Sequence, residues 1–181
     1  MNTEKAYAEL LRQKKAAAIG KPLLGAWEFL PSTFHFPVSK ERRDLAELEM
    51  LSKWHDWQMP ISLKRVLQNG KTLLITDGEQ RIEFVSAQFE HMTGYSAEEA
   101  RGKKPSFLQG KETASATLVD IRLAVEKKQG IKTELINYKK NGDPYLCEIE
   151  ILPLFTSKGM FSHFLALEQE KSFPFFRSRT S

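Results

Sequence analysis

The stretch Gly102-Lys103-Lys104-Pro105-Ser106-Phe107-Leu108-Gln109-Gly110 lies between two segments with helical sequence patterns. Its two glycines can adopt the positive φ angles that sharp turns require. Pro105 suits the first position of a short helix, where its missing N–H would be unpaired in any case. Phe107 and Leu108 supply apolar bulk, and the adjacent Gln109 amide, if buried, must meet a backbone group or a ligand. The stretch therefore predicts a turn and a short helix that close a core.

The composition is that of a folded, water-soluble chain. The 181 residues are 41% hydrophobic and 28% charged, which is typical of globular domains and fits one domain with an extension. No apolar run approaches the roughly 20 residues of a membrane-spanning helix, and residues 1–5 lack the start of a secretory signal. The single Cys147 excludes an internal disulfide and a cysteine-rich zinc site. We therefore expect a cytoplasmic protein with no membrane contact.

The net charge of +4 is concentrated at the two ends of the chain. Acidic side chains outnumber basic ones over residues 71–170, whereas residues 171–181 carry basic side chains only. A nucleic-acid-binding domain concentrates positive charge on its folded surface. This charge distribution argues against nucleic acid as a partner.

Residues 1–70 predict an N-terminal helical extension. Apolar residues recur at helical spacing over residues 4–19, and an irregular stretch rich in aromatic residues and interrupted by prolines follows over residues 23–38. A second helix is expected over residues 39–57, with a short helix in 61–70. The helix over 39–57 has a wide apolar face, which predicts burial on more than one side. This face comprises Ala46, Met50, Trp54 and Trp57 and is widened by Leu48 and Leu51.

From residue 71 the pattern predicts an α+β domain with a five-stranded antiparallel sheet and short helices on one face. Strands are expected over 72–77, 81–86, 131–138, 144–155 and 160–170, with helices over 88–92, 96–101 and 114–128. Ser96 and Glu99 form a capping-box pattern at one of these helices. Two strands, a run of helices and a three-stranded meander place the helices on one side of the sheet. Residues 171–181 remain as a short basic tail.

The quoted stretch also resembles a known signature. Gly-x-x-x-x-Phe-Leu-Gln-Gly is similar to the motif of the light-oxygen-voltage (LOV) branch of the PAS family, in which a cysteine forms a photo-adduct with flavin. Here Pro105 stands at the cysteine position. Residues 84–102, the Gly-x-Glu-Thr at 110–113 and the Leu135–Gly142 hairpin match further phrases of the family in the same order. The resemblance covers about residues 71–170 and implies a PAS fold.

The resemblance implies a set of flavin-binding residues. Gln109 matches the motif glutamine, Asn137 an asparagine at the pyrimidine edge of the flavin and Thr76 a threonine near the ring. Arg122 matches an arginine that pairs with the phosphate, and Glu168 stands where the family has a signalling glutamine, unless Gln169 takes that position. The candidate cofactor-binding residues are therefore Thr76, Gln109, Arg122, Asn137 and Glu168, and the implied cofactor is FMN or FAD.

Other positions depart from the family pattern. Cys147 replaces a second asparagine, and Ser106 replaces a second phosphate-binding arginine. A buried carboxylate at Glu168 would be costly unless it were protonated or paired. Two alternatives follow from this partial match: a cysteine-less flavin-binding sensor of blue light or redox state, and a ligand-free PAS interaction module.

No other chemistry is indicated. The four histidines, His35, His55, His91 and His163, show no metal-ligand spacing, and no phosphate-binding loop or kinase phrase occurs. We expect a sensory, signal-transducing PAS domain that is not an enzyme. It would act as a homodimer through its N-terminal helices and the outer sheet face, or through a protein signalling partner.

Overall fold

The computed structural model describes residues 39–172. The helix expected over 4–19 and the aromatic stretch over 23–38 lie outside the described residues, as do residues 173–181. Within the described part, no helix is long and apolar enough to cross a membrane.

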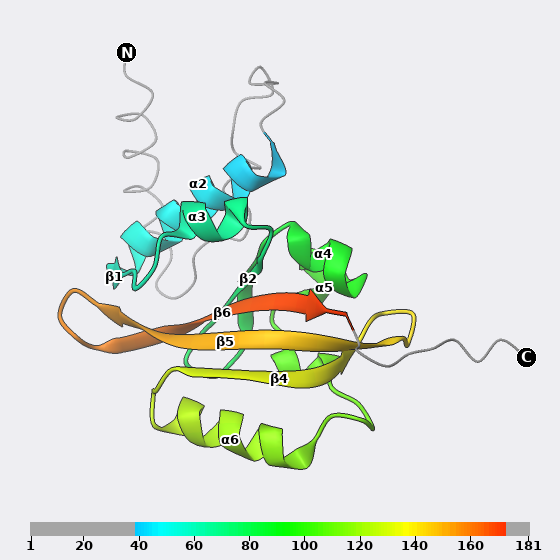
Figure 1. Ribbon diagram of the computed structural model, residues 1–181. Coiled ribbons are helices and arrows are strands. Elements are labelled where there is room, and N and C mark those ends of the chain that lie inside the picture. Colours follow the sequence, from blue (N-terminus) through cyan, green and yellow to red (C-terminus); the bar gives the residue numbers. More distant parts are fainter. Residues whose placement is uncertain (1–38, 173–181) are drawn as a thin grey trace, which may run out of the picture. The chain divides into compact units, whose positions relative to one another are not determined.

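An antiparallel sheet forms the centre of the fold, and its order confirms the expected α+β class (Figure 1). Along the sheet the strands run β4-β5-β6-β2-β3, and the two-residue β1 pairs with the far end of β5. The five longer strands are the predicted ones; β1 is an addition. Their bounds are β1 (Trp57–Gln58), β2 (Thr72–Thr76), β3 (Ile82–Val85), β4 (Ile131–Tyr138), β5 (Pro144–Thr156) and β6 (Phe161–Lys171).

Helices cover both faces of this sheet (Figure 1). The predicted short helices pack on the inner face, and two helices of the extension pack on the outer face. The inner set is α4 (Gln88–Thr93), α5 (Ala97–Ala100), the 3-10 helix η2 (Pro105–Leu108) and α6 (Ser115–Glu126); the outer set is α2 (Lys40–Trp54) and α3 (Leu63–Gln68). Central strands β2 and β6 are therefore buried on both sides, which explains why β2 is a continuous apolar and threonine run instead of an alternating one.

The inner core lies between the sheet and helices α4 to α6. Phe89 and Met92 of α4 and Ala100 of α5 meet side chains of β2, β5 and β6 there. The Ser96–Glu99 capping box is confirmed: the Ser96 hydroxyl accepts from the Glu99 amide at 3.2 Å, and the Glu99 carboxylate accepts from the Ser96 amide at 3.0 Å. These contacts fix α5, and with it the start of the stretch that carries η2.

The outer core corrects the expected face of the second helix. Leu48 and Leu51 are its buried residues, whereas Ala46 is exposed and the Trp54 side chain is 43% exposed. Trp57 does not belong to the helix, because α2 ends at Trp54 and Asp56 takes a left-handed φ of 56° that turns the chain into β1. Leu48 and Leu51, three residues apart, therefore form the stripe that faces the sheet.

Polar contacts also attach α2 to the rest of the domain. The Ala87 amide donates to the Asp44 carboxylate at 2.8 Å, and Arg101 pairs with Glu47 at 3.1 Å. Burial raises the pKa of both carboxyl groups, opposed by the Ala87 amide at Asp44 and by Arg101 at Glu47. The helix is thus an integral layer of the fold and not a detached arm.

Candidate functional site

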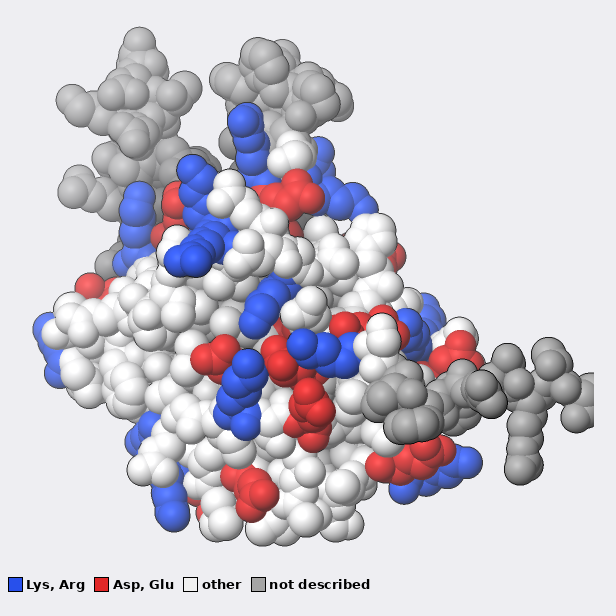
Figure 2. Space-filling model, in the orientation of Figure 1, with Lys and Arg blue, Asp and Glu red and all other residues white. Residues whose placement is uncertain are grey.

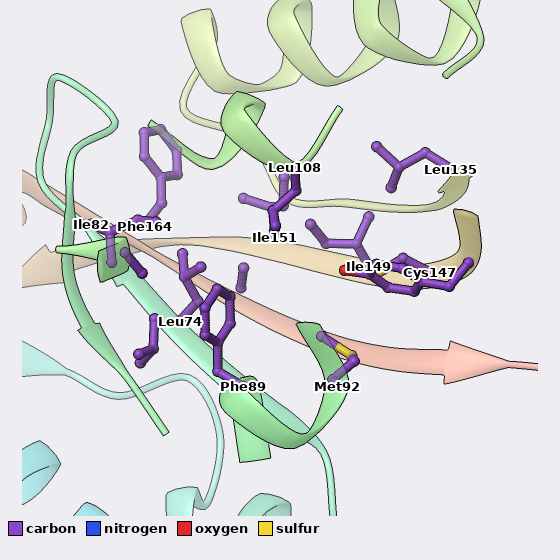
Figure 3. Close-up of a cluster of buried hydrophobic side chains, with 14 residues drawn as sticks. Leu74, Ile82, Phe89, Met92, Leu108, Leu135, Cys147, Ile149, Ile151 and Phe164 are labelled. Atoms are coloured by element: carbon purple, nitrogen blue, oxygen red, sulfur yellow. The ribbon is translucent and has the colours of Figure 1, made fainter. Parts of the chain in front are cut away.

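A cavity of about 120 Å³, measured as room for the centre of a water molecule, lies between η2, α6 and the inner face of the sheet. Its walls are mainly apolar. Figure 3 shows Leu108 pointing from η2 toward Ile151, with Ile149 and Leu135 alongside. Ile121 and Val125 of α6 close another side. A cavity of about 150 Å³ by this kind of measure accepts a benzene-sized guest, so the space holds about one aromatic ring.

The Gly102–Gly110 stretch spans this cavity because both of its ends are fixed to the sheet. At the first end, the Ile82 amide donates to the Lys103 carbonyl at 2.9 Å, and the Gly102 amide donates to the Ile82 carbonyl at 2.8 Å. Gly102 takes a φ of 75°, as expected for a turn glycine. Pro105 occupies the first turn of η2, which confirms the short-helix prediction.

The second end is fixed by the Gly-x-Glu-Thr phrase. The Thr113 hydroxyl donates to the Ile136 carbonyl of β4 at 2.6 Å and accepts from the Gly110 amide at 2.9 Å. The Tyr138 hydroxyl accepts from the Glu112 amide at 3.0 Å. Gly110 is required here for close approach and not for a positive φ: a Cβ at this position would lie 2.3 Å from the Tyr138 ring. These contacts hold the segment after η2 against β4.

Four of the five candidate residues line this one cavity. Thr76 ends β2, Asn137 lies on β4 and Glu168 on β6, and all three are buried; Gln109 follows η2 and is half-buried. Arg122 is exposed on α6 and does not belong to the lining. Glu168, and not Gln169, takes the inward position, because Gln169 is exposed.

Two polar atoms at this cavity lack a hydrogen-bond partner within the described part of the chain. They are Asn137 Oδ1 and Glu168 Oε2, both buried. Burial raises the pKa of Glu168 to about 7, because desolvation disfavours the charged form. The carboxyl group is therefore close to an even balance between its neutral and ionised forms at neutral pH. A neutral carboxyl can donate a hydrogen bond as well as accept one.

Tyr145 and Cys147 lie next to these groups in the inner core. The Tyr145 hydroxyl, a third buried atom without a hydrogen bond of good geometry, lies near the Asn137 amide. Burial, then the Glu168 charge, raises the pKa of both Tyr145 and Cys147. The Cys147 side chain is fully buried and its thiol stays protonated, so it is a small core residue and not a nucleophile.

The sequence did not single out three polar residues that also line the cavity: Gln80, Lys104 and Ser106. Lys104 and Ser106 flank Pro105, and Ser106 is the residue that replaces the motif arginine. The position of Lys104 and Ser106 next to Pro105 is the sequence feature that could have predicted their place at the cavity, because consecutive residues of η2 line its edge. Phe107, in contrast, packs on Tyr95 with ring centroids 5.0 Å apart.

The sequence profile of the PAS domain family matches residues 70–170. The chain belongs to the PAS domain family. Its Gly102–Gly110 motif and its relatives make it a LOV-like member with Pro105 in place of the cysteine.

The relatives of this PAS domain include a blue-light photoreceptor of Listeria monocytogenes, 37% identical over 101 residues, which are 54% of this chain and 40% of that protein. A light-oxygen-voltage domain studied with a flavin analogue has a TM-score of 0.57 at 28% identity, covering 63% of this chain and 87% of that one. The light-state LOV structure of the blue-light photoreceptor Aureochrome1 has a TM-score of 0.55 at 30% identity, covering 61% and 90%. The matches span 40% or less of the length of the curated relatives.

Proposed function

We propose that this PAS domain is a cysteine-less, flavin-binding sensor of blue light or redox state. The observation that carries the proposal is the pair of unpaired buried oxygens, Asn137 Oδ1 and Glu168 Oε2, at the cavity. Buried polar atoms nearly always have partners, so a polar ligand is the natural one. The pyrimidine edge of a flavin carries both donors and acceptors, and flavin is named with one of the structural neighbours.

The polar and apolar residues of the cavity would contact different parts of a bound flavin. Asn137 and Glu168 would contact the polar edge of the ring, with Gln109 and Thr76 beside it. Leu108, Ile149 and Ile151 would contact its faces. Lys104 at the cavity and Arg122 on the exposed side of α6 are the cations available to an anionic tail that leaves the cavity for solvent. A bound FMN or FAD would supply the absorption of blue light and the capacity to accept electrons.

The size of the cavity sets a condition on this function. A three-ring flavin needs more room than one benzene-sized space, so part of the wall must move outward on loading. Helix α6 is the wall suited to move, because none of its residues is fully buried. Segments with few buried contacts open at the lowest free energy.

The absence of a thiol at residue 105 determines how a signal would leave the cavity. Neither Pro105 nor the protonated, core-buried Cys147 can form an adduct with the ligand. The change must therefore pass through hydrogen bonds and proton occupancy. Glu168 on β6 is the residue suited to this, because its pKa near 7 lets it gain or lose a proton at neutral pH.

We further propose that the output is a homodimer or a complex with a protein partner. On the outer face, α2 and α3 cover β2, β3 and β6. These helices do not cover the region around Glu148, where the Glu148 carboxylate pairs with Lys132 at 3.6 Å and with Lys171 at 3.3 Å. Figure 2 shows acidic and basic side chains interspersed over the face in view, which suits a protein partner better than a polyanion.

The mass of the full chain in solution, compared with a chain beginning at residue 39, tests this output. A dimer that is lost when Leu146, half-buried beside Glu148, is changed to Arg supports the proposal. A monomer at all concentrations contradicts the homodimer and leaves the complex with a protein partner. Removing residues 1–60 instead would also disrupt the outer core, because α2 supplies Leu48 and Leu51 to it. The effect on dimerisation could then not be separated from a loss of folding.

Flavin binding is tested by the absorption spectrum of the purified protein before and after addition of FMN, with the affinity measured by fluorescence quenching. We expect a structured blue band, and a loss of affinity of about 10-fold or more in Asn137→Ala, since one good polar contact contributes about 1.5 kcal/mol. Asn141→Ala, in the exposed hairpin turn, is the matched control. A colourless protein with no response to FMN or FAD would leave the alternative function, a ligand-free interaction module, which the small size of the cavity favours.

A further inference from the structure

The outer side of the sheet brings together three potential metal ligands from distant parts of the sequence. His55 follows α2, Glu83 lies on β3 and His163 on β6. One ligand atom of each residue lies within 4.8 Å of those of the other two. The His163 Nε2 and Glu83 Oε2 atoms are 3.2 Å apart. Two ligands bound about 2.1 Å from one tetrahedral ion are about 3.4 Å apart, so this pair already has the required separation.

His55 is held in place by its own backbone and by ring stacking. Its amide donates to the Leu51 carbonyl at 2.9 Å, and the next residue, Asp56, accepts from the Ser157 amide at 2.9 Å. The imidazole stacks on Trp57 at 4.9 Å with an interplanar angle of 10°, and its centroid is 4.3 Å from that of His163. The Nε2 atom of His55 is buried and has no hydrogen-bond partner among residues 39–172. A buried nitrogen left unpaired beside a carboxylate and a second imidazole is available as a ligand for a cation.

His163 has the outer contact that metal-bound histidines usually have. Its Nδ1 atom is 2.5 Å from the Ser162 hydroxyl, which also accepts from the Trp57 indole N–H at 3.1 Å. With Nδ1–H donating to that oxygen, the Nε2 lone pair faces Glu83. Such a contact fixes the tautomer and the ring orientation of a ligating histidine.

We propose that His55, Glu83 and His163 form a binding site for one divalent transition-metal ion of the zinc class. Two imidazoles and one carboxylate suit Zn²⁺ and its neighbours, and are a poor set for Mg²⁺ or Ca²⁺. The Glu83 side chain is 31% exposed, so the ion has a path from solvent and a fourth position open to water. The site would bind the end of α2 to strands β3 and β6, on the face opposite the cavity, and does not depend on flavin.

Zinc titration of the full chain by calorimetry tests the site, with Co²⁺ as a second probe because its visible absorption reports a tetrahedral nitrogen and oxygen environment. The variants are His55→Gln and Glu83→Gln, which change partly exposed side chains and keep their approximate size. His91→Gln is the control, because His91 is exposed on α4 outside the cluster. Circular dichroism of each variant verifies the fold.

We expect one Zn²⁺ per chain in the wild type and in His91→Gln. Loss of a residue that only contacts a metal ligand costs roughly 10- to 100-fold in metal affinity. His55→Gln and Glu83→Gln should each lose at least this much affinity for Zn²⁺ and should lose the tetrahedral Co²⁺ band. Ser162→Ala should lose an amount within that range. Absence of zinc binding, or equal binding by His55→Gln and wild type, would show that the three side chains are only a stacked and hydrogen-bonded cluster. Equal losses in all variants, His91→Gln included, would show adventitious surface binding and would likewise overturn the proposal.

Discussion

Replacing Glu168 by Gln removes a carboxyl group that is only 2% exposed and has one oxygen without a partner, and it keeps the shape of the side chain. Burial raises the pKa of this group from 4.5 to about 7. Between these two values the folded protein holds a proton that the unfolded chain has lost, so rising pH favours unfolding of the wild type. The glutamine variant has no such proton, so its free energy of unfolding lacks this dependence on pH.

The interval from 4.5 to about 7 corresponds to about 3 kcal/mol, at about 1.4 kcal/mol per pH unit. The stabilising contribution of the neutral Glu168 is therefore complete below pH 4.5, declines as pH rises and is lost above pH 7. Relative to wild type, Glu168→Gln should gain about 3 kcal/mol in free energy of unfolding between pH 4 and pH 8. Most of this gain should occur before pH 7.

Urea denaturation of the two flavin-free proteins at half-unit pH intervals measures this difference, in which the titration of all other groups cancels. Glu126→Gln serves as the control for the loss of one carboxylate, because Glu126 is exposed at the end of α6. A difference for Glu168→Gln that changes by less than about 1 kcal/mol across the range would refute the reasoning, because it would mean that the carboxyl group is hydrated or paired in the folded protein.

Three further substitutions test the segment from α5 to the residues that follow η2. Gly110→Ala forces a Cβ to within 2.3 Å of the Tyr138 ring and should lower the free energy of unfolding by about 2–3 kcal/mol in urea titrations; a loss no larger than that of Gly159→Ala would contradict the close approach. Ser96→Ala removes the capping hydroxyl of α5 and should lower the Tm by an amount equivalent to about 1 kcal/mol; Ser62→Ala is the comparison, because Ser62 precedes α3 and its side chain makes no capping hydrogen bond. Leu108→Ala should cost about 2–5 kcal/mol but raise FMN affinity, because it enlarges the cavity; an FMN affinity equal to that of the wild type would show that the ring does not lie against η2.

Features encoded by neighbouring residues could be predicted from the sequence. The capping box at Ser96, the hairpin that ends at Gly142 and the proline that opens η2 each depend on contacts within a few residues. The strand positions follow in the same way, because β-branched and apolar runs end at turn residues. The motif glutamine and asparagine also came together at one cavity, since the order of matched phrases fixes which strands and helices carry them.

Features that depend on tertiary contacts could not be predicted in this way. The left-handed Asp56 ends α2 three residues before the expected end and sends Trp57 into β1, and no local pattern marks that residue. The histidine cluster was missed because His55 and His163 lie far apart in the sequence and become neighbours only after α2 packs on the sheet. Arg122 was assigned to the site by the family resemblance, but it lies on the exposed side of α6 and outside the cavity lining.

Strand β6 has a cavity on one side and the α2–α3 core on the other, and its residues contribute alternately to the two. Glu168 borders the cavity, and the preceding residue, Leu167, is buried in the outer core. Because both side chains are attached to one backbone segment, a twist or shift of β6 at Glu168 also displaces Leu167. A strand movement at Glu168 is therefore shared between the inner face of the sheet and the core under α2 and α3.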